Sequence, residues 1–284
     1  MIIGSIYIAV EAMSAAYAAP GAERSLVRSV DYFAWIRPYN QLLVKSNLAN
    51  EVGVDGALSY VSDLASYWSY SSLHYYRLTD RGTFGGRINS ARRFGTTAVQ
   101  YQAEDYPVFS NGVYAAFNLA YANTSQTLFA SYQYRAEGYF PLPYNYEYSL
   151  GQGGQFFPRF SDKRIYLFTG SIGKYIGDYF VWARPYYYTP QSNFLYEVGL
   201  RRTFVDPNQF VSVRLNAGHL PDIGDLPPLD NIITVSQTAI AVGGQLPLRN
   251  NFFVKADVSY AHQKYPADLV RNITTLYLSV FVRF

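Results

Sequence analysis

Apolar and polar residues alternate along the end of the chain, from Arg271 to Phe284. Leu276 and Leu278 fall on one face of an extended segment, whereas Tyr277 and Ser279 fall on the other. A period of two is typical of a β-strand that has one apolar face and one more polar face. The pattern therefore predicts a strand that runs to the last residue of the sequence.

The same alternation recurs from residue 51 onward in about fourteen segments of strand length. The clearest segments span 113–121, 128–136, 144–151, 194–203, 211–217 and 252–261. Apart from Arg202 at the end of one segment, the charged residues within them fall on one side, as they must if the other side faces lipid, where a charge at mid-bilayer costs up to about 2–4 kcal/mol. This predicts an all-β fold, an antiparallel up-and-down transmembrane β-barrel of about 12–14 strands over residues 51–284.

Composition narrows the choice of fold class. Charged residues make up 15% of the chain, aromatic residues 18%, and the mean hydropathy is −0.07. No apolar run approaches the ~20 residues that a spanning helix needs, so a helical membrane protein is excluded. A barrel crosses lipid with only half of its residues, which keeps the mean hydropathy near zero. A soluble, lipocalin-like barrel is the disfavoured alternative.

The net charge of +3 is too small to indicate nucleic acid as a partner, and cysteine is absent.

The first fifty residues carry two further expectations. Residues 1–18 resemble a secretory signal peptide, with an apolar run to Val10 and a small-residue site ending at Ala18. Glu11 interrupts this pattern and no basic residue precedes it, so a short buried strand or helix is the alternative. Residues 19–50 are expected to form a periplasmic segment, a plug within the lumen, or an extra strand.

The connections between the expected strands alternate in length. Counted backward from Phe284, segments 264–271, 219–230 and 157–163 are longer, whereas 246–250, 205–208, 176–178 and 142–145 are short. Outer-membrane barrels have short periplasmic turns and long outer loops. The end of the barrel that carries Phe284 is therefore expected to be periplasmic.

Candidate chemistry is sparse. His74, His219 and His262 lie far apart and none forms a His-x-Ser arrangement, so a lipid hydrolase centred on His262 is a minor hypothesis beside a polar interface residue. Asp222, Asp225 and Asp230 lack the regular ligand spacing of a calcium loop. We expect no catalytic residue, no metal site and no cofactor.

The polar faces of the strands predict the lining of the lumen. The charged residues expected to face inward are Glu104, Arg135, Glu137, Glu147, Arg184, Glu197, Arg201, Arg214, Lys255 and Asp257. Their signs balance, which argues against strong ion selectivity. Tyr114 and Tyr277, together with Tyr186 and Tyr188, are expected beside them and suit stacking on sugar rings. Either residues 19–50 and loop residues such as Arg159 fill this interior, or it conducts a solute.

Several motifs resemble the YaiO-type outer-membrane β-barrel family. They are Arg92-Arg93-Phe94-Gly95, Tyr106-Pro107 and above all the hairpin Gly170-Ser171-Ile172-Gly173-Lys174-Tyr175-Ile176-Gly177-Asp178-Tyr179, with Gly151, Arg184 and Arg201 as further matching positions. The resemblance covers roughly residues 51–284. It implies an integral barrel of the Gram-negative outer membrane, without an established enzymatic activity. The final Phe284 also resembles the terminal signal that the barrel-assembly machinery reads.

These observations favour a non-enzymatic outer-membrane protein. We expect a narrow pore or structural barrel, with a link to envelope polysaccharide passage as the finer hypothesis and an outer-membrane lipid-modifying enzyme (an acyl hydrolase or transferase) as the alternative. Outer-membrane lipid and the barrel-assembly machinery are expected partners, and a saccharide is the candidate solute. The sequence does not indicate an oligomeric state.

Overall fold

The computed structural model describes residues 50–284, apart from 63–65, 80, 94–95, 110–111, 124–127, 158–162, 190, 207, 224–231, 250 and 267–268. The expected signal peptide and nearly all of segment 19–50 lie outside the described residues, as does most of the loop with Asp225 and Asp230. No helix among the residues that are described is long and apolar enough to cross a membrane.

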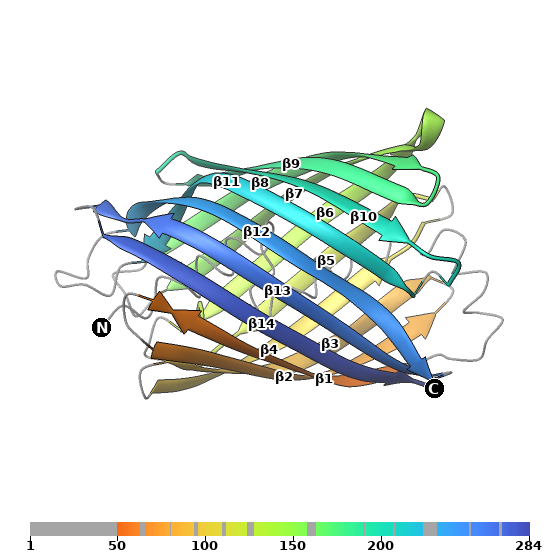
Figure 1. Ribbon diagram of the computed structural model, residues 1–284, viewed down its shortest axis with the longest axis horizontal. Helices are drawn as coiled ribbons and strands as arrows, with labels where there is room; N and C mark the ends of the chain where they lie inside the picture. Colours follow the sequence, from red (N-terminus) through yellow and green to blue (C-terminus); the bar gives the residue numbers. More distant parts are fainter. Residues whose placement is uncertain are drawn as a thin grey trace.

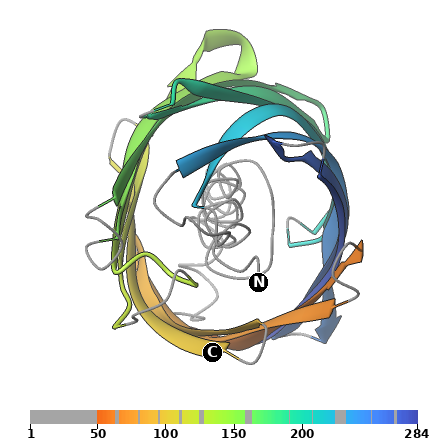
Figure 2. The ribbon, with the colours of Figure 1, turned by 90° about the vertical axis from the view of Figure 1, so that its left-hand side faces the viewer.

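Fourteen antiparallel strands form a closed barrel, as the alternating pattern predicts. Every strand pairs with its sequence neighbours, and the first pairs with the last, so the strands form a continuous ring when seen along the axis (Figure 2). The strands are β1 (Asn50–Val61), β2 (Ser66–Thr79), β3 (Gly82–Arg93), β4 (Thr96–Pro107), β5 (Tyr114–Tyr121), β6 (Tyr132–Leu142), β7 (Tyr146–Phe157), β8 (Lys163–Ile176), β9 (Tyr179–Thr189), β10 (Asn193–Thr203), β11 (Phe210–Ile223), β12 (Ile232–Arg249), β13 (Phe252–Lys264) and β14 (Val270–Arg283).

The seam between β1 and β14 closes the wall. Its register runs without interruption from the pair Glu51–Arg283 to the pair Val61–Ile273. At one end the backbone N–H of Asn50 donates to the carbonyl of Phe284 at 2.9 Å, and the N–H of Phe284 donates back at 3.0 Å. This leaves no open strand edge, which is the condition for a sheet to exist in lipid.

Side chains alternate between the two faces of this wall. On β14 the residues Leu276 and Leu278 are exposed on the outside, whereas Tyr277 and Ser279 are buried on the inside. The same contrast holds around the ring, because Val198, Val213 and Val258 are also exposed. An apolar outer face and a polar inner face identify a transmembrane type of barrel, since a soluble barrel would have the reverse arrangement.

The turns differ between the two ends of the barrel, whose strands slant across its long axis (Figure 1). At the end that carries Phe284, β8 and β9 are joined by Gly177 and Asp178, and β6 and β7 by the 3-10 turn η2 (Pro143–Asn145). Gly177 has a φ of +58°, a left-handed conformation that glycine adopts readily. At the opposite end, ten residues separate the end of β5 from the start of β6, and eight separate the end of β11 from the start of β12. The two longest connections thus lie opposite Phe284, as expected for outer loops. The alternation is incomplete, because β4–β5 and β10–β11 at the Phe284 end are joined by six residues and β3–β4 at the other end by two.

One expected strand begins later than its pattern indicates. The alternation over 128–136 places Leu128 and Ala130 on the lipid face, but β6 begins at Tyr132 and both residues are fully buried. The chain turns here, with the N–H of Ser131 donating to the carbonyl of Phe156 at 3.0 Å. Leu128 and Phe129 pack with Tyr70 and other buried residues of β2–β4. Burial against inward-facing side chains therefore replaces the strand pairing that the alternation suggests.

The seam yields a cross-linking prediction. Ser59 and Thr275 face each other across β1 and β14, with their hydroxyl oxygens 2.8 Å apart. The chain has no cysteine, so the double variant Ser59→Cys/Thr275→Cys should form a single disulfide that closes the ring covalently. After oxidation and heating, it should keep a faster electrophoretic mobility that reductant abolishes.

The matched control is Ser59→Cys/Ser279→Cys. Ser279 also faces inward, but it pairs with Asp55 further along the seam. A cross-link in this control and none in the first variant would contradict the register of β1 and β14.

Candidate functional site

The lumen is the part of this barrel that can carry a function based on polar side chains. All ten charged residues expected to face inward lie on the buried side of their strands, and none is more than 6% exposed. They are Glu104 on β4, Arg135 and Glu137 on β6, Glu147 on β7, Arg184 on β9, Glu197 and Arg201 on β10, Arg214 on β11, and Lys255 and Asp257 on β13. Their positions follow from strand parity, since each alternates with an apolar outward neighbour.

Six further residues belong to this lining, although the sequence-based prediction did not include them. They are Glu51, Asp55, His74, Arg87, Arg271 and Arg283, each no more than 4% exposed. Their positions in the alternating pattern of the sequence already place them on the inward face. Glu51 and Asp55 alternate with Val52 and Val54, and Arg283 shares its face with Ser279. The set of sixteen comprises all the buried charged or histidine side chains of the described residues.

A first group of these side chains spans β1 to β4 and is called the β1–β4 cluster. His74 Nδ1 lies 3.0 Å from a carboxylate oxygen of Asp55. The Arg87 guanidinium lies 3.2 Å from Glu104 and 3.5 Å from Asp55. Tyr76 donates to Glu104 at 2.6 Å and accepts a hydrogen bond from Arg87 at 2.8 Å. Charges with several partners tolerate burial that isolated charges do not.

A second group lies on β6, β7 and β9 around Glu137. Arg184 donates to one of its carboxylate oxygens at 2.6 Å, and Arg135 donates to the other at 2.9 Å. The Ser149 hydroxyl donates to the first oxygen, also at 2.6 Å. Residues from three strands thus meet on one carboxylate, and this ties the wall together from the inside.

A third group is predominantly basic and spans β10 to β14. The cationic groups of Arg201 and Lys255 lie 5.8 and 5.6 Å from the centre of the Phe210 ring. Arg283 donates to Asn208 at 2.6 Å and to Glu51 at 3.0 Å. Further along the wall, Arg214 donates to Asp257 at 3.1 Å. Arg271 lies over the Tyr265 ring at 4.8 Å.

The two halves of the lumen wall have opposite net charge. Strands β1–β7 carry five buried carboxylates and two arginines, for a net charge of −3 without His74. Strands β8–β14 carry two carboxylates and six basic residues, for a net charge of +4. The ring is closed in strand order, so the two halves face each other across the axis. The balanced overall charge therefore conceals a transverse separation, which a count over the whole chain does not reveal.

Tyrosines fill much of the space between these charged groups. Tyr114, Tyr186, Tyr188 and Tyr277 all lie on the buried side, at no more than 2% exposure. Tyr114 stacks on Tyr139, with ring centroids 4.6 Å apart and planes inclined by 6°. Aromatic rings are thus packed among the charged groups of the lumen wall.

The three histidines lie on three different strands. His262 lies half-buried on β13, and its Nδ1 is 2.8 Å from the side-chain oxygen of Asn272, which also accepts from Tyr260 at 2.9 Å. His219 lies on β11, far from His74 in the β1–β4 cluster. The part of the chain that is described contains no group of three or more residues suited to hold a metal ion.

An apolar outer wall, a polar inner wall and a closed antiparallel ring define the class of the molecule. It is an outer-membrane β-barrel with a porin-like fold. Within that class, the model of the YaiO membrane beta barrel domain matches residues 49–223, more than half of the chain, and the chain belongs to this family.

Solved structures of similar fold are outer-membrane barrels too. The outer membrane protein Omp33 of Acinetobacter baumannii is 15% identical, with a TM-score of 0.48 over 84% of this chain and 98% of that chain. A bacterial polysaccharide outer membrane secretin is 7% identical, with a TM-score of 0.50 over 84% and 99%. OpdQ of Pseudomonas aeruginosa is 7% identical, with a TM-score of 0.47 over 83% and 99%. At these identities the likeness concerns the fold alone. No curated protein matches the chain.

The Glu137 group yields a stability prediction. Replacing Glu137 with Ala removes the shared acceptor of Arg135 and Arg184 and leaves two buried cations without it. Loss of one partner from a buried ion pair typically costs about 3–5 kcal/mol. We expect a destabilisation of this order, measured by denaturant unfolding in lipid vesicles with tryptophan fluorescence. The control is Asp105→Ala, an exposed carboxylate on the outer face of β4. An equal, small effect of both substitutions would show that the group does not stabilise the wall.

Proposed function

We propose that this protein is a non-enzymatic pore of the bacterial outer membrane and that it admits saccharides bearing acidic groups. The observation that carries the proposal is the transverse separation of charge in a lumen lined with tyrosines. A saccharide chain in this space has an aromatic surface for its rings and a basic wall for its carboxylates or other acidic groups.

The basic wall supports the acidic character of the solute. The cationic groups of Arg201 and Lys255 lie 5.8 and 5.6 Å from the centre of the Phe210 ring, so two cations and one aromatic ring from β10, β11 and β13 lie close together. Arginine and lysine bind carboxylates through charge-assisted hydrogen bonds, which are stronger than those between neutral groups. Neutral sugar hydroxyls also have partners here, because Asn216, Gln237 and Gln263 form a hydrogen-bonded row in which Gln237 donates to Asn216 at 3.0 Å.

The acidic half of the lumen wall guides the solute and does not bind it. Its net charge of −3 repels the acidic groups of a solute and so favours the opposite face. A solute held on one side only keeps many weak contacts and can still leave, which is a requirement for conduction. The fold is compatible with this role, because a polysaccharide outer membrane secretin has a similar barrel.

Planar-bilayer recordings test the proposal. The full chain should produce discrete conductance steps, and an oligouronate on one side should interrupt the current, whereas an uncharged oligosaccharide of equal length should do so more weakly. Arg201→Gln should shorten each interruption by about tenfold, the effect of losing one charge-assisted hydrogen bond. Glu147→Gln, which removes a charge from the acidic half, should not shorten it.

Two outcomes would contradict the proposal. Recordings that stay silent for the full chain and for a variant lacking residues 19–49 would exclude a pore. Equal interruptions by the charged and the uncharged oligosaccharide would exclude the basic wall as the recognition surface.

A further inference from the structure

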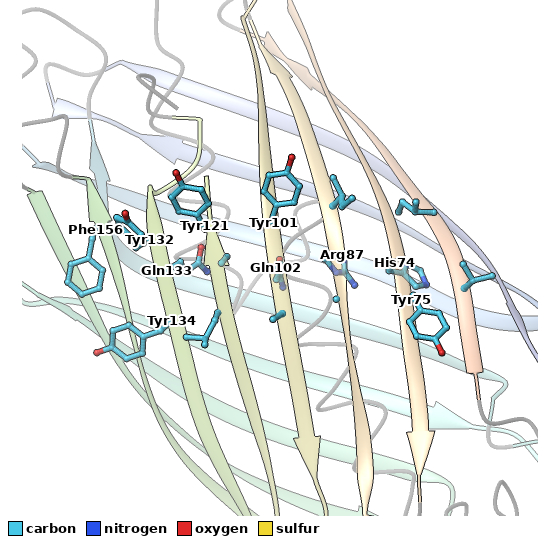
Figure 3. Close-up of a pocket in the computed structure, with 17 residues that line it drawn as sticks. His74, Tyr75, Arg87, Tyr101, Gln102, Tyr121, Tyr132, Gln133, Tyr134 and Phe156 are labelled. Atoms are coloured by element: carbon cyan, nitrogen blue, oxygen red, sulfur yellow. The ribbon is translucent and has the colours of Figure 1, made fainter. Parts of the chain in front are cut away.

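The lipid-facing surface is not uniformly smooth. A groove of about 780 Å³ crosses the outer face of the wall from β1 to β7 (Figure 3). Most of its lining residues are apolar or aromatic and point outward, and they include Leu73, Tyr75, Ile88 and Tyr101, each more than 40% exposed. The hollow therefore lies on the lipid-facing side of the wall.

The register of the strands creates the hollow. Leu73, Ile88, Tyr101, Tyr121 and Tyr132 are consecutive partners across β2 to β6 and form one row of outward side chains. The next row toward the periplasmic end contains Tyr75, Gly86, Ala103, Leu119 and Tyr134. The second row therefore has two small residues side by side, and these form the floor.

Gly86 cannot be replaced by a larger residue without rearrangement. A Cβ atom at this position would lie 2.7 Å from the carbonyl oxygen of Gln102. The aromatic rings also leave the floor uncovered. Figure 3 shows the hydroxyl groups of Tyr101 and Tyr121 pointing toward one end of the strands and that of Tyr75 pointing toward the other. The groove is thus built into the backbone and the ring orientations.

The groove reaches the outer end of the barrel. Tyr121 is the last residue of β5 and Tyr132 the first of β6, at the end opposite Phe284, and their ring centroids are 5.4 Å apart. Leu73 and Tyr75 lie near the middle of β2. The groove therefore descends from the outer membrane surface into the hydrocarbon region, along the path of an acyl chain.

Two arginines stand beside the groove at the same end. Arg92 is the last but one residue of β3 and Arg164 the second residue of β8, and both side chains are exposed. Arg92 pairs with Ser69 and Thr97 on the neighbouring strands, and Arg164 pairs with Phe156 of the groove lining. Basic residues at the membrane surface attract anionic lipid headgroups. The outer ends of β3 and β8 thus carry cations that a phosphate can pair with, near the end at which the groove opens.

We propose that this groove is a binding site for a phosphorylated, multiply acylated glycolipid of the outer leaflet. One acyl chain lies over Gly86 and Ala103, the interfacial tyrosines Tyr121 and Tyr132 contact the sugar–acyl boundary, and a phosphate pairs with Arg92 or Arg164. The site is separate from the lumen, so the proposal is independent of any pore function.

The test uses the full chain in detergent micelles with purified lipid A as the probe, and bound lipid is counted by native mass spectrometry. The wild-type protein should retain one lipid A. Ala103→Trp, which fills the groove, should abolish this adduct. The matched control is Ala183→Trp, an exposed outward alanine on β9 at the other side of the ring, and it should retain the lipid. Heat-modifiable mobility checks that both variants fold.

The headgroup contact is tested separately. Arg92→Ala and Arg164→Ala should together weaken binding by at least about tenfold, and removal of the phosphates from lipid A should have the same effect. Arg202→Ala, an exposed arginine near the periplasmic end of β10, should have none. Equal retention by Ala103→Trp and Ala183→Trp would overturn the site. A change in oligomeric state caused by Ala103→Trp without loss of lipid would instead assign the groove to contact between copies of the chain.

Discussion

The whole structure depends on the need to satisfy backbone hydrogen bonds where water is absent. In hydrocarbon an unpaired N–H or C=O group costs several kcal/mol, so a sheet is stable there only when it has no edge. The antiparallel pairing of β1 with β14 meets this condition, and Asn50 and Phe284 bond to each other at its end. Once the ring is closed, strand geometry assigns every second side chain to the lumen, and the placement of charge follows.

The lumen shows how a membrane barrel accommodates many charges. Its carboxylates do not stand alone. Glu137 accepts from Arg135 and Arg184, and Asp55 lies near both His74 and Arg87. Such partners compensate for the loss of water around a charge. The same pairing that stabilises the wall also arranges its field, because most of the basic side chains belong to β8–β14 and most of the carboxylates to β1–β7.

The sequence was sufficient for the fold because a period of two is a local signal. It identified the apolar row on β14 and assigned ten charged residues to the opposite side of their strands, without knowledge of any strand partner. It failed where the local signal was overridden, as at Leu128, whose burial comes from a turn and from contacts with β2–β4. It also could not place features that arise between strands. Gly86 and Ala103 become neighbours only through the register of β3 with β4, and the two oppositely charged halves face each other only when the ring is closed. The expectations for residues 1–18 and for segment 19–50 remain predictions.

The seam has a consequence for how the molecule acquires its form. Arg283 meets Glu51 across 232 positions of sequence. Chain entropy opposes such distant contacts until the intervening strands are already aligned. The wall is therefore expected to assemble hairpin by hairpin and to gain most of its cooperativity in a single late step, when two remote edges join. A partly assembled sheet would still expose two unsatisfied edges to the bilayer, so the finished ring has no stable smaller version of itself.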